Sequence, residues 1–560
     1  MNQEIRSKLD RICNILWGGG LAVPTLFVEQ ISYLIYLKLL DEREAELELK
    51  ARLLKGKGNG KPLFPDQASR YRWSNWRFKS GKELRDFVRD EVFPYMASLL
   101  KEEPQVAIYF QDAKLEIEDP HVLKEVIDGL DTFQFGKLGP DVKGDIFEYL
   151  LQYLSRQPQS DMGQFRTPRQ IRMAMVEMVD PDLGDTICDL ACGTAGCLVD
   201  CVEHILAKYS AEPREVPIYG EEWLADRGWT LAQARKGIPN LQTYRKGAGE
   251  KIPDWELLER SIFGFEVSRQ MMRISMMNLV LHGIRNAHVK RANSLSELGG
   301  MSDEDLHRRY KCILMNPPFA GMLPTESIRK DLPTQSKKSE LLFLGLAMES
   351  LAVGGVCAII VPEGALFGST SSHIELRKKL LEDYELLAVI SLPAGVFKPY
   401  AGVKTGILVF RKPAETAKAE SRKQKAEKGD GRRVWFYQIN NDGYDPDKIT
   451  GGGRPETPER NDIPEMLRQW KTFKASGFKK PPGKEAGALL PPGTEEVKCW
   501  WAKIRTIAEN DYNLAAGRYK PQVAEKAPEE DPAELIAKTL KVEREITSGL
   551  EKLLQEVAKA

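Results

Sequence analysis

The residues Asn316-Pro317-Pro318-Phe319 follow an apolar run, 312–315, without any intervening polar residue. Proline has no backbone N–H to donate to a sheet, so the two prolines end the strand that this run predicts. The result is a rigid corner that carries an amide and an aromatic ring. In open α/β sheets, ligands bind at the carboxyl ends of the strands. The alternative is an ordinary strand-to-loop turn, which Asn-Pro often forms.

A glycine-containing turn follows another apolar run upstream. In DTICDLACGTAGCLVD, residues 185–200, a predicted strand delivers Asp189, and a tight turn then opens a helix. Glycine lets backbone N–H groups approach a ligand closely, and the amino end of a helix favours negative charge. The candidate binding residues of this turn are Gly193, Thr194, Ala195 and Gly196.

Two more polar residues end predicted strands. Glu266 ends the run SIFGFE, where an acid can accept hydrogen bonds from both hydroxyls of a ribose. The alternative for Glu266 is a charge that complements the dipole of the following helix. Asn293, in HVKRANSL, lies where the edge of an adenine ring would bind. Four polar strand ends in this order predict a nucleoside cofactor beside a reaction site.

The predicted cofactor is neither a dinucleotide nor a nucleoside triphosphate. The turn lacks the G-x-G-x-x-G spacing, and Glu266 lies about 70 residues beyond it instead of roughly 20. No G-x-x-x-x-G-K-[ST] motif occurs in this region.

The elements that must position these residues change character along the chain. Apolar residues at three- and four-residue spacing predict helices up to about residue 160. From Leu183, short apolar runs alternate with helical segments, which predicts a mostly parallel, doubly wound sheet. Two late runs, AVISLPAGVF and KTGILVFRK, could form an antiparallel hairpin at one edge. The predicted strands are 186–190, 262–266, 313–316, 356–361, 387–392, 406–410 and 434–439.

The last part of the chain is rich in glycine and proline and ends in a Leu/Ile seam among many Lys and Glu residues. This seam predicts an amphipathic helix of coiled-coil character. We therefore predict an N-terminal helical domain (1–160), an α/β catalytic domain (161–445), a Gly/Pro-rich linker and extension (446–530) and a C-terminal amphipathic helix (531–560).

Composition limits the kinds of partner. The 81 Lys and Arg residues balance the 81 Asp and Glu residues, so the formal net charge is zero. Proteins that bind nucleic acid by themselves usually have a net basic surface. A protein of this charge would bind nucleic acid locally or through a partner.

The amino terminus has no secretory signal, and the most apolar stretch, 22–40, contains charged residues and a proline. We therefore expect a cytoplasmic protein without a membrane span, and its eight cysteines read as reduced thiols. Cys188, Cys192, Cys197 and Cys201 have the spacing of neither a zinc knuckle nor a zinc ribbon. We predict core residues there and no metal.

The motifs resemble a known family. Asn316-Pro317-Pro318-Phe319 is similar to the N/D-P-P-F/Y signature of S-adenosylmethionine-dependent methyltransferases that act on amino groups of DNA bases, and CGTAG resembles their cofactor loop. GQFRTPRQI, 163–171, is similar to a segment of the methylation subunit of type I restriction–modification enzymes. LWGGG, DIFEYLL, PEGALFG and NDYNLAAGRY agree with that subunit, so the resemblance spans nearly the whole chain.

The resemblance implies a Rossmann-like methyltransferase fold, with a mixed seven-stranded sheet between an N-terminal helical domain and a C-terminal helical tail. It implies a site-specific adenine-N6 methyltransferase that acts on double-stranded DNA and is associated with the nucleoid when bound. The implied partners are a specificity subunit, with two methylation subunits for each, and a restriction subunit. The implied S-adenosylmethionine-binding residues are Gln164, Phe165, Arg166, Thr167, Pro168, Arg169, Asp189, Gly193, Thr194, Ala195, Gly196, Glu266 and Asn293. For the Thr-Pro pair, helix capping is the alternative.

Three features depart from the family pattern. Arg166 stands where the family usually has Tyr, and Asn293 replaces a usual Asp, although an amide can still hydrogen-bond adenine. The stretch 207–260 is longer than the pattern needs, and we interpret it as a surface insertion.

The corner suits methylation of an exocyclic amine. The lone pair of such an amine is delocalised into the ring, and two acceptors on its hydrogens would localise it. Asn316 Oδ1 and the Pro317 carbonyl are the candidates for this stabilisation of developing positive charge, and positioning would supply most of the rest. Phe319 would stack on a base that has left the duplex; its alternative is a core aromatic. Methylation of a cytosine carbon needs a Pro-Cys nucleophile, and the chain contains no Pro-Cys pair.

Two other functions share these motifs. RNA and protein-glutamine methyltransferases also use N-P-P-[FY], but their chains usually lack the helical preface and the GQFRTPR segment. A catalytically silent scaffold is the alternative outside enzymes, and binding of S-adenosylmethionine would distinguish it.

Overall fold

The computed structural model describes most of the chain. The described residues are 3–53, 62–101, 103–138, 140–152, 167–209, 214–217, 230, 232–233, 243–246, 255–319, 321–398, 401–414, 431–449, 454–491, 494–524 and 532–557. The greater part of the predicted insertion, 207–260, lies outside these residues.

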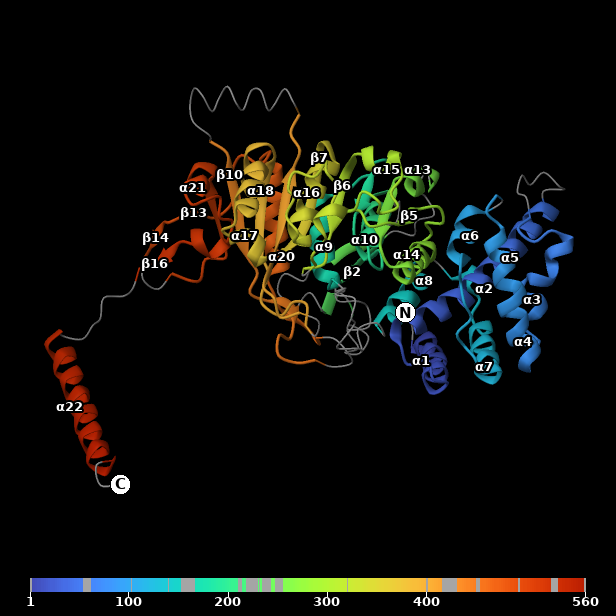
Figure 1. Cartoon of the computed structure of the whole chain (residues 1–560), viewed down its shortest axis with the longest axis horizontal. Helices are drawn as coiled ribbons and strands as arrows, with labels where there is room; N and C mark the ends of the chain where they lie inside the picture. Colours follow the sequence, from blue (N-terminus) through green and yellow to red (C-terminus); the bar gives the residue numbers. More distant parts are fainter. Residues whose placement is uncertain are drawn as a thin grey trace.

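The N-terminal part is helical, as its periodicity predicts, and lies at one end of the molecule (Figure 1). Proline at the first or second helical position begins several of these helices, where its missing N–H has no cost. At α7 the Asp119 side chain also accepts a hydrogen bond from the His121 N–H. The main helices are α1 (Gln3–Gly18), α2 (Pro24–Leu53), α4 (Gly81–Phe87), α5 (Phe93–Ser98), α6 (Pro104–Phe110), α7 (Pro120–Asp131) and α8 (Pro140–Gln152).

One mixed sheet forms the centre of the molecule. All seven strands predicted from the apolar runs belong to it, as does the strand predicted before Asn293, and two further strands extend it to ten among the described residues. The order is β13 (Lys484–Glu485), β15 (Cys499–Lys503), β10 (Arg433–Gln438), β8 (Glu385–Ser391), β9 (Thr405–Arg411), β7 (Leu351–Pro362), β6 (Tyr310–Met315), β1 (Ile187–Asp189), β4 (Ile262–Glu266) and β5 (His288–Arg291).

Strands β5, β4, β1, β6 and β7 are parallel, whereas β9 is antiparallel to both of its neighbours. The predicted antiparallel pairing of β8 with β9 is therefore present. It lies inside the sheet and not at an edge, because β10 pairs with the other side of β8.

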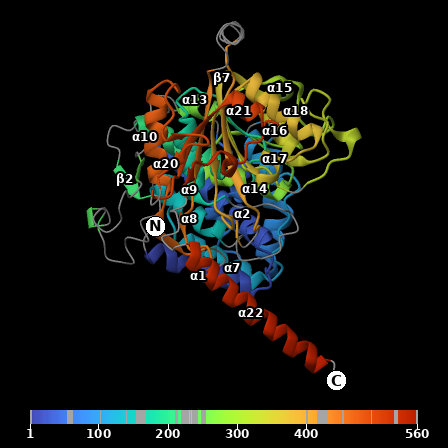
Figure 2. The same ribbon diagram turned by 90° about the vertical axis from the view of Figure 1, so that its left-hand side faces the viewer.

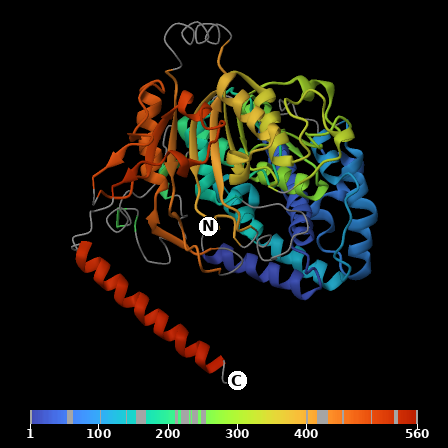
Figure 3. The same ribbon diagram turned by 60° about the vertical axis from the view of Figure 1, so that its left-hand side comes forward.

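Helices cover both faces of the sheet and enclose two apolar cores. On one face, α9 (Arg169–Val179), α10 (Gly196–Tyr209), α14 (Arg269–Leu281) and α20 (Ile463–Ala475) contribute to a core that continues into the N-terminal helices. On the other face, α16 (Ser339–Ser350), α17 (Glu363–Phe367) and α18 (Ser371–Glu382) enclose the second core. Figure 3 shows helices in front of the sheet and the N-terminal helices beside it. Since the first core crosses the boundary, the N-terminal helices are docked firmly on the α/β part.

The segment 446–530 differs from the predicted linker. Its strand β15 pairs with β10 in the main sheet, and its helix α20 packs against the same strand. Trp470 and Trp500 are fully buried, and Trp500 stacks on Phe436 with ring centroids 6.4 Å apart. Glycine and proline indicated a linker, but the burial of these large aromatic side chains outweighs the cost of ordering the segment.

Helix α22 (Pro532–Val557) stands apart from the rest of the molecule in Figures 1 and 2. Every side chain whose burial is described along it is exposed. The exposed apolar residues of its seam include Leu535, Ile536, Leu540, Ile546, Leu550, Leu553 and Leu554. The predicted C-terminal helix is therefore present, and its apolar seam is uncovered.

Among the described residues, none of the helices combines the length and apolar character needed to cross a bilayer.

Candidate active site

The carboxyl ends of β1, β4, β5 and β6 surround one cavity of about 290 Å³. Parallel strands end at the same edge, which is why polar residues far apart in the sequence converge here. Its walls include most of the predicted site residues that the structure describes. These are Thr167, Asp189, Gly193, Thr194, Gly196, Glu266, Asn293, Asn316, Pro317 and Pro318. Gln164, Phe165 and Arg166 lie outside the described residues.

The turn after β1 is a tight backbone loop held from two sides. Gly193 has a φ of +53°, a conformation that glycine adopts without steric cost, and its N–H donates to Glu266 Oε2 at 3.0 Å. The Thr194 carbonyl accepts a hydrogen bond from Asn278 Nδ2 of α14 at 2.8 Å. Ala195 also has a positive φ, +61°, so the turn stores local strain. Gly196 packs against the Arg172 guanidinium, which leaves no space for a side chain.

Two buried carboxylates face this turn. Asp189 accepts a hydrogen bond from the Ala191 N–H at 3.0 Å, and Glu266 Oε1 accepts one from the Ser268 N–H at 2.8 Å. Burial raises the pKa of Asp189 to about 7, and the charge of Glu266 adds to that shift. A cavity that contains two carboxylates, one of them with a raised pKa, suits a ligand that brings positive charge or hydroxyl donors.

The loop after β5 places Asn293 on the cavity wall. Its Oδ1 accepts a hydrogen bond from the Leu295 N–H at 3.2 Å. The neighbouring Ser294 hydroxyl donates to the Leu190 carbonyl at 2.8 Å, and the buried Arg329 donates to the Ser294 carbonyl at 3.3 Å. The loops after β1 and β5 are therefore joined. The sequence pattern did not indicate Arg329, because it lies in a loop with no periodicity.

The Asn-Pro-Pro corner follows β6 as predicted. Asn316 Nδ2 donates to Thr167 Oγ1 at 2.9 Å, while Asn316 Oδ1 is buried and has no hydrogen-bond partner in the structure. A buried acceptor without a partner costs about 1–3 kcal/mol, so this oxygen is available for a donor on a ligand. The amide is oriented by Thr167, and its oxygen is the free end.

Phe319 does not line the cavity. Its ring is buried and contacts Phe397 edge-to-face, with centroids 5.2 Å apart and an interplanar angle of 71°. In this structure it occupies the core position that was the alternative to base stacking.

The residues at the start of α9 do not all lie at the cavity. Thr167 lines the cavity, and Pro168 is the residue immediately before α9, so the Thr167 side chain does not cap the helix. Arg169 lies instead beside Glu203, with an N–O distance of 3.4 Å. Of this predicted motif, Thr167 is the described residue placed at the cavity.

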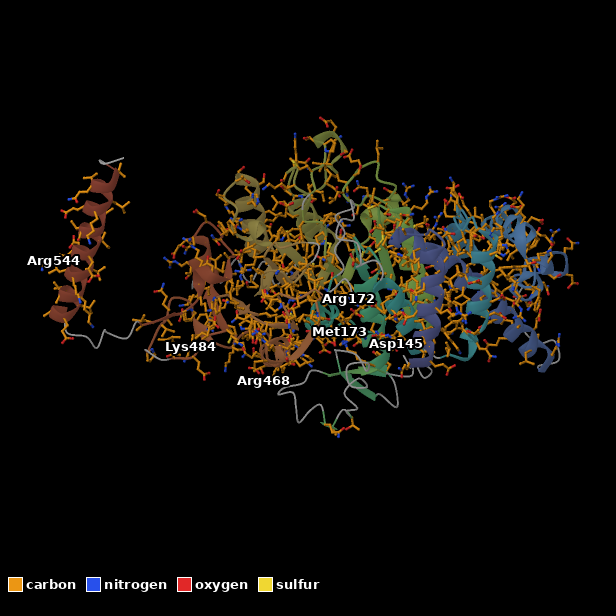
Figure 4. The ribbon with its side chains drawn as sticks, turned by 90° about the horizontal axis from the view of Figure 1, so that it is seen from below. Asp145, Arg172, Met173, Arg468, Lys484 and Arg544 are labelled. Carbon is orange, nitrogen blue, oxygen red and sulfur yellow. The ribbon has the colours of Figure 1, made fainter. Side chains whose placement is uncertain are left out.

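Arg172 is a cavity residue that the motifs did not indicate. It forms a buried ion pair with Asp200 at 2.6 Å and donates to the Thr167 carbonyl at 3.2 Å. Figure 4 shows it on α9 near the middle of the molecule. Two opposite charges within the apolar stretches of α9 and α10 were the available signal. The ion pair links the segment that carries Thr167 to the helix after the glycine turn.

No group of three or more potential metal ligands occurs among the described residues. The described cysteines near the turn, Cys188, Cys192, Cys197 and Cys201, are buried, and burial raises the pKa of each thiol.

Comparison with known proteins gives the site its context. Residues 139–528 match the family model described as N-6 DNA methylase, and residues 5–130 match the HsdM N-terminal domain. The chain belongs to the N-6 DNA methylase family. It is an adenine-N6 DNA methyltransferase and the methylation subunit of a type I restriction–modification system.

Relatives and solved structures agree with this assignment. The type I restriction enzyme EcoEI methylase subunit of Escherichia coli is 30% identical over 423 residues, which cover 73% of this chain and 72% of that protein. The EcoKI methylase subunit of Escherichia coli K12 is 26% identical, over 73% of this chain and 68% of that protein. A structure described as showing assembly and conformational transition of the type I R-M system is 25% identical, with a TM-score of 0.64 over 100% of this chain and 99% of that one.

Proposed function

We propose that this methyltransferase takes its methyl group from S-adenosylmethionine bound in the cavity and transfers it to an adenine flipped out of double-stranded DNA. The observation that carries the proposal is the buried, unpartnered Asn316 Oδ1 beside a cavity with two carboxylates. An acceptor without a partner at this position suits the hydrogens of an exocyclic amine.

The cavity residues fit the parts of that cofactor. Glu266 can accept hydrogen bonds from the ribose hydroxyls, and Asn293 can hydrogen-bond the adenine edge. Asp189 and the turn 193–196 would hold the charged amino-acid part, and Thr167, which also lines the cavity, accepts a hydrogen bond from Asn316. From the resemblance alone, we add Gln164, Phe165, Arg166, Pro168 and Arg169 to the cofactor-binding set.

In the reaction, the cofactor supplies an electrophilic sulfonium methyl. Asn316 Oδ1 and the Pro317 carbonyl accept hydrogen bonds from the two hydrogens of the adenine amine and stabilise positive charge as it develops on nitrogen. Pro317 and Pro318 keep these acceptors rigid. Thr167 Oγ1 accepts a hydrogen bond from Asn316 Nδ2, which leaves Asn316 Oδ1 for the base. Positioning of amine and methyl in line provides most of the remaining rate enhancement.

We propose that Phe319 stacks on the flipped base. This role requires its ring to leave the contact with Phe397. Phe319→Leu separates the two roles, since leucine keeps an apolar contact but has no aromatic face for stacking.

The proposed assembly contains two methylation subunits and one specificity subunit, and a restriction subunit is a further partner. We propose that it works in the cytoplasm. The zero net charge supports DNA binding that depends on a partner subunit, because neutralisation of phosphates supplies much of the affinity for duplex DNA. The uncovered seam of α22 supports a helical partner, because an isolated amphipathic helix is marginal in water.

The test is transfer of labelled methyl from S-adenosylmethionine to genomic DNA, with and without the co-expressed specificity subunit. We expect N6-methyladenine at one sequence, and only when the specificity subunit is present. Methylation of a defined sequence at full rate by this chain alone would contradict the borrowed specificity. Absence of transfer in both cases, with Asn316 intact, would contradict the catalytic roles.

A further inference from the structure

One described residue of the N-terminal helices lines the cavity. Thr25, in the first turn of α2, is half-buried and lines the same cavity as Asp189, Glu266 and Asn316. No motif of the catalytic domain includes this residue. Its position raises the question of what keeps α2 at the cavity.

A buried ion pair holds α2 against α14. Glu29, one helical turn after Thr25, pairs with Arg273 at 2.6 Å, and both side chains are almost completely buried. Tyr33 of α2 and Gln270 of α14 also donate hydrogen bonds to Glu29, at 2.9 and 3.3 Å. Because a buried charge without its partner is costly, this pairing specifies the position of α2 on α14.

Helix α14 also contacts the cofactor cavity directly. Its Met271 lines the cavity, and its Asn278 donates to the Thr194 carbonyl in the glycine turn at 2.8 Å. The helix therefore connects three things: the N-terminal helices, the cavity wall and the turn. A ligand that fills the cavity would contact residues of both domains.

We propose that Thr25 contacts the bound cofactor, so that the N-terminal helical domain forms part of the cofactor site. This inference rests on the proposed binding of S-adenosylmethionine in the cavity. Two consequences follow. A larger side chain at Thr25 obstructs the cofactor, and cofactor binding stabilises the docking of α2, because coupling between two sites is reciprocal.

The first test is calorimetric titration of the full chain with S-adenosylmethionine. Thr25→Phe should weaken binding at least tenfold, whereas Thr25→Ser, which keeps a small hydroxyl side chain, should stay within about threefold of the unmodified chain. Thr132→Phe is the matched control, because Thr132 is an exposed threonine at the end of α7 in the same domain. Thermal melting checks that each variant folds. Unchanged affinity in a folded Thr25→Phe protein would overturn the inference.

The second test needs no substitution. Hydrogen exchange of the unmodified full chain should show slower exchange in residues 24–31 on addition of S-adenosylmethionine. Unchanged exchange there, at saturating cofactor, would overturn the inference even if Thr25→Phe fails to fold.

Glu266→Ala separates this inference from the proposed function. If the unmodified chain binds S-adenosylmethionine and Glu266→Ala weakens binding while Thr25→Phe does not, the role of Thr25 alone is wrong. If the unmodified chain does not bind the cofactor, the proposed function fails, and the inference fails with it.

Discussion

The cavity at the carboxyl ends of the strands and helix α22 differ in what the chain provides by itself. At the cavity, the Glu266 carboxylate accepts two backbone hydrogen bonds, and Asn278 of a neighbouring helix holds the glycine turn. At α22, apolar side chains such as Leu550 and Leu554 are 62% and 71% exposed. The first region is preorganised within one chain, whereas the second has apolar surface that its own chain does not cover.

We expect the two regions to serve different steps, the cavity the reaction and α22 the binding of a partner. Several buried polar groups of the cavity are held by hydrogen bonds from the same chain, and the buried Asn316 Oδ1, which has no partner in the structure, is left for a ligand. An exposed apolar seam is useful when a partner covers it.

Removing the Asn316 amide should affect the reaction and spare the cofactor. We expect Asn316→Ala to lower the methylation rate by about 10²–10³-fold or more, because one fixed polar group at a developing charge typically contributes this much. Affinity for S-adenosylmethionine should stay within a few-fold. Methyl-transfer assays and calorimetry give both values, and Asn316→Asp, which keeps an oxygen acceptor, is the matched variant. Full activity of a folded Asn316→Ala protein would exclude the assigned role.

Removing α22 should abolish assembly and spare the cavity. The cut belongs after Ala524, because strand β16 (Gln522–Val523) pairs with β14 (Leu489–Leu490) and an earlier end would break that pairing. We expect the shortened chain to bind S-adenosylmethionine normally but to elute apart from the specificity subunit in size-exclusion chromatography. If the shortened chain still assembles with the specificity subunit, the proposed role of α22 is wrong, but the dependence on that subunit is not.

The pKa of Asp189 should make stability depend on pH. The native group titrates near 7 and the unfolded one near 4, so between these values the native state alone keeps the proton. Its contribution to the free energy of unfolding therefore falls as pH rises from about 4 to 7, by about 1.4 kcal/mol per unit of pKa difference. Thermal melting of the cofactor-free protein from pH 5 to 8 measures this. Asp189→Asn should show a flatter profile, and identical profiles would exclude the explanation.

Removing the Glu266 carboxylate should have a smaller effect than removing the Asn316 amide, and it should lower the affinity for S-adenosylmethionine. Loss of a charged acceptor costs about 1.5–3 kcal/mol, so Glu266→Ala should weaken the binding of S-adenosylmethionine about ten- to a hundredfold. A calorimetric titration measures this affinity. Glu266→Gln keeps the shape of the side chain, and its affinity for S-adenosylmethionine should lie between those of the unmodified chain and Glu266→Ala. If affinity does not change, Glu266 acts on the helix after it and on the turn, and not on the ribose.

The smallest effect should come from the seam of α22. Replacing Leu550 and Leu553 by Ser should change the melting temperature of the isolated chain very little, since substitutions of exposed side chains usually stay within about 0.5 kcal/mol. The same pair should weaken assembly with the specificity subunit. A clear loss of melting temperature would mean that the seam packs on its own chain in solution.

The sequence by itself indicated most of the polar residues that line the cavity and the type of most elements that carry them. Asp189, Glu266, Asn293 and Asn316 lie at or just after the ends of predicted strands, and the edge rule for parallel strands brings such residues together. The apolar periods of helix and strand are local properties, so the N-terminal helices, most strands of the sheet and α22 could be predicted, whereas β13 and β15 were not.

Only the tertiary structure decided which distant elements meet. Thr25 and Arg172 reach the cavity because α2 docks on α14 and α9 pairs with α10, contacts that no local period contains. Glycine and proline indicated a linker at 446–530, yet Trp470 and Trp500 are buried against the sheet. The side on which Phe319 lies was also undecided, because an aromatic ring after a turn can pack inward or face a ligand. The physical reason is common to all these cases: burial and buried pairing are gained between elements far apart in the chain, and local sequence shows only that a side chain needs a partner and not which partner it finds.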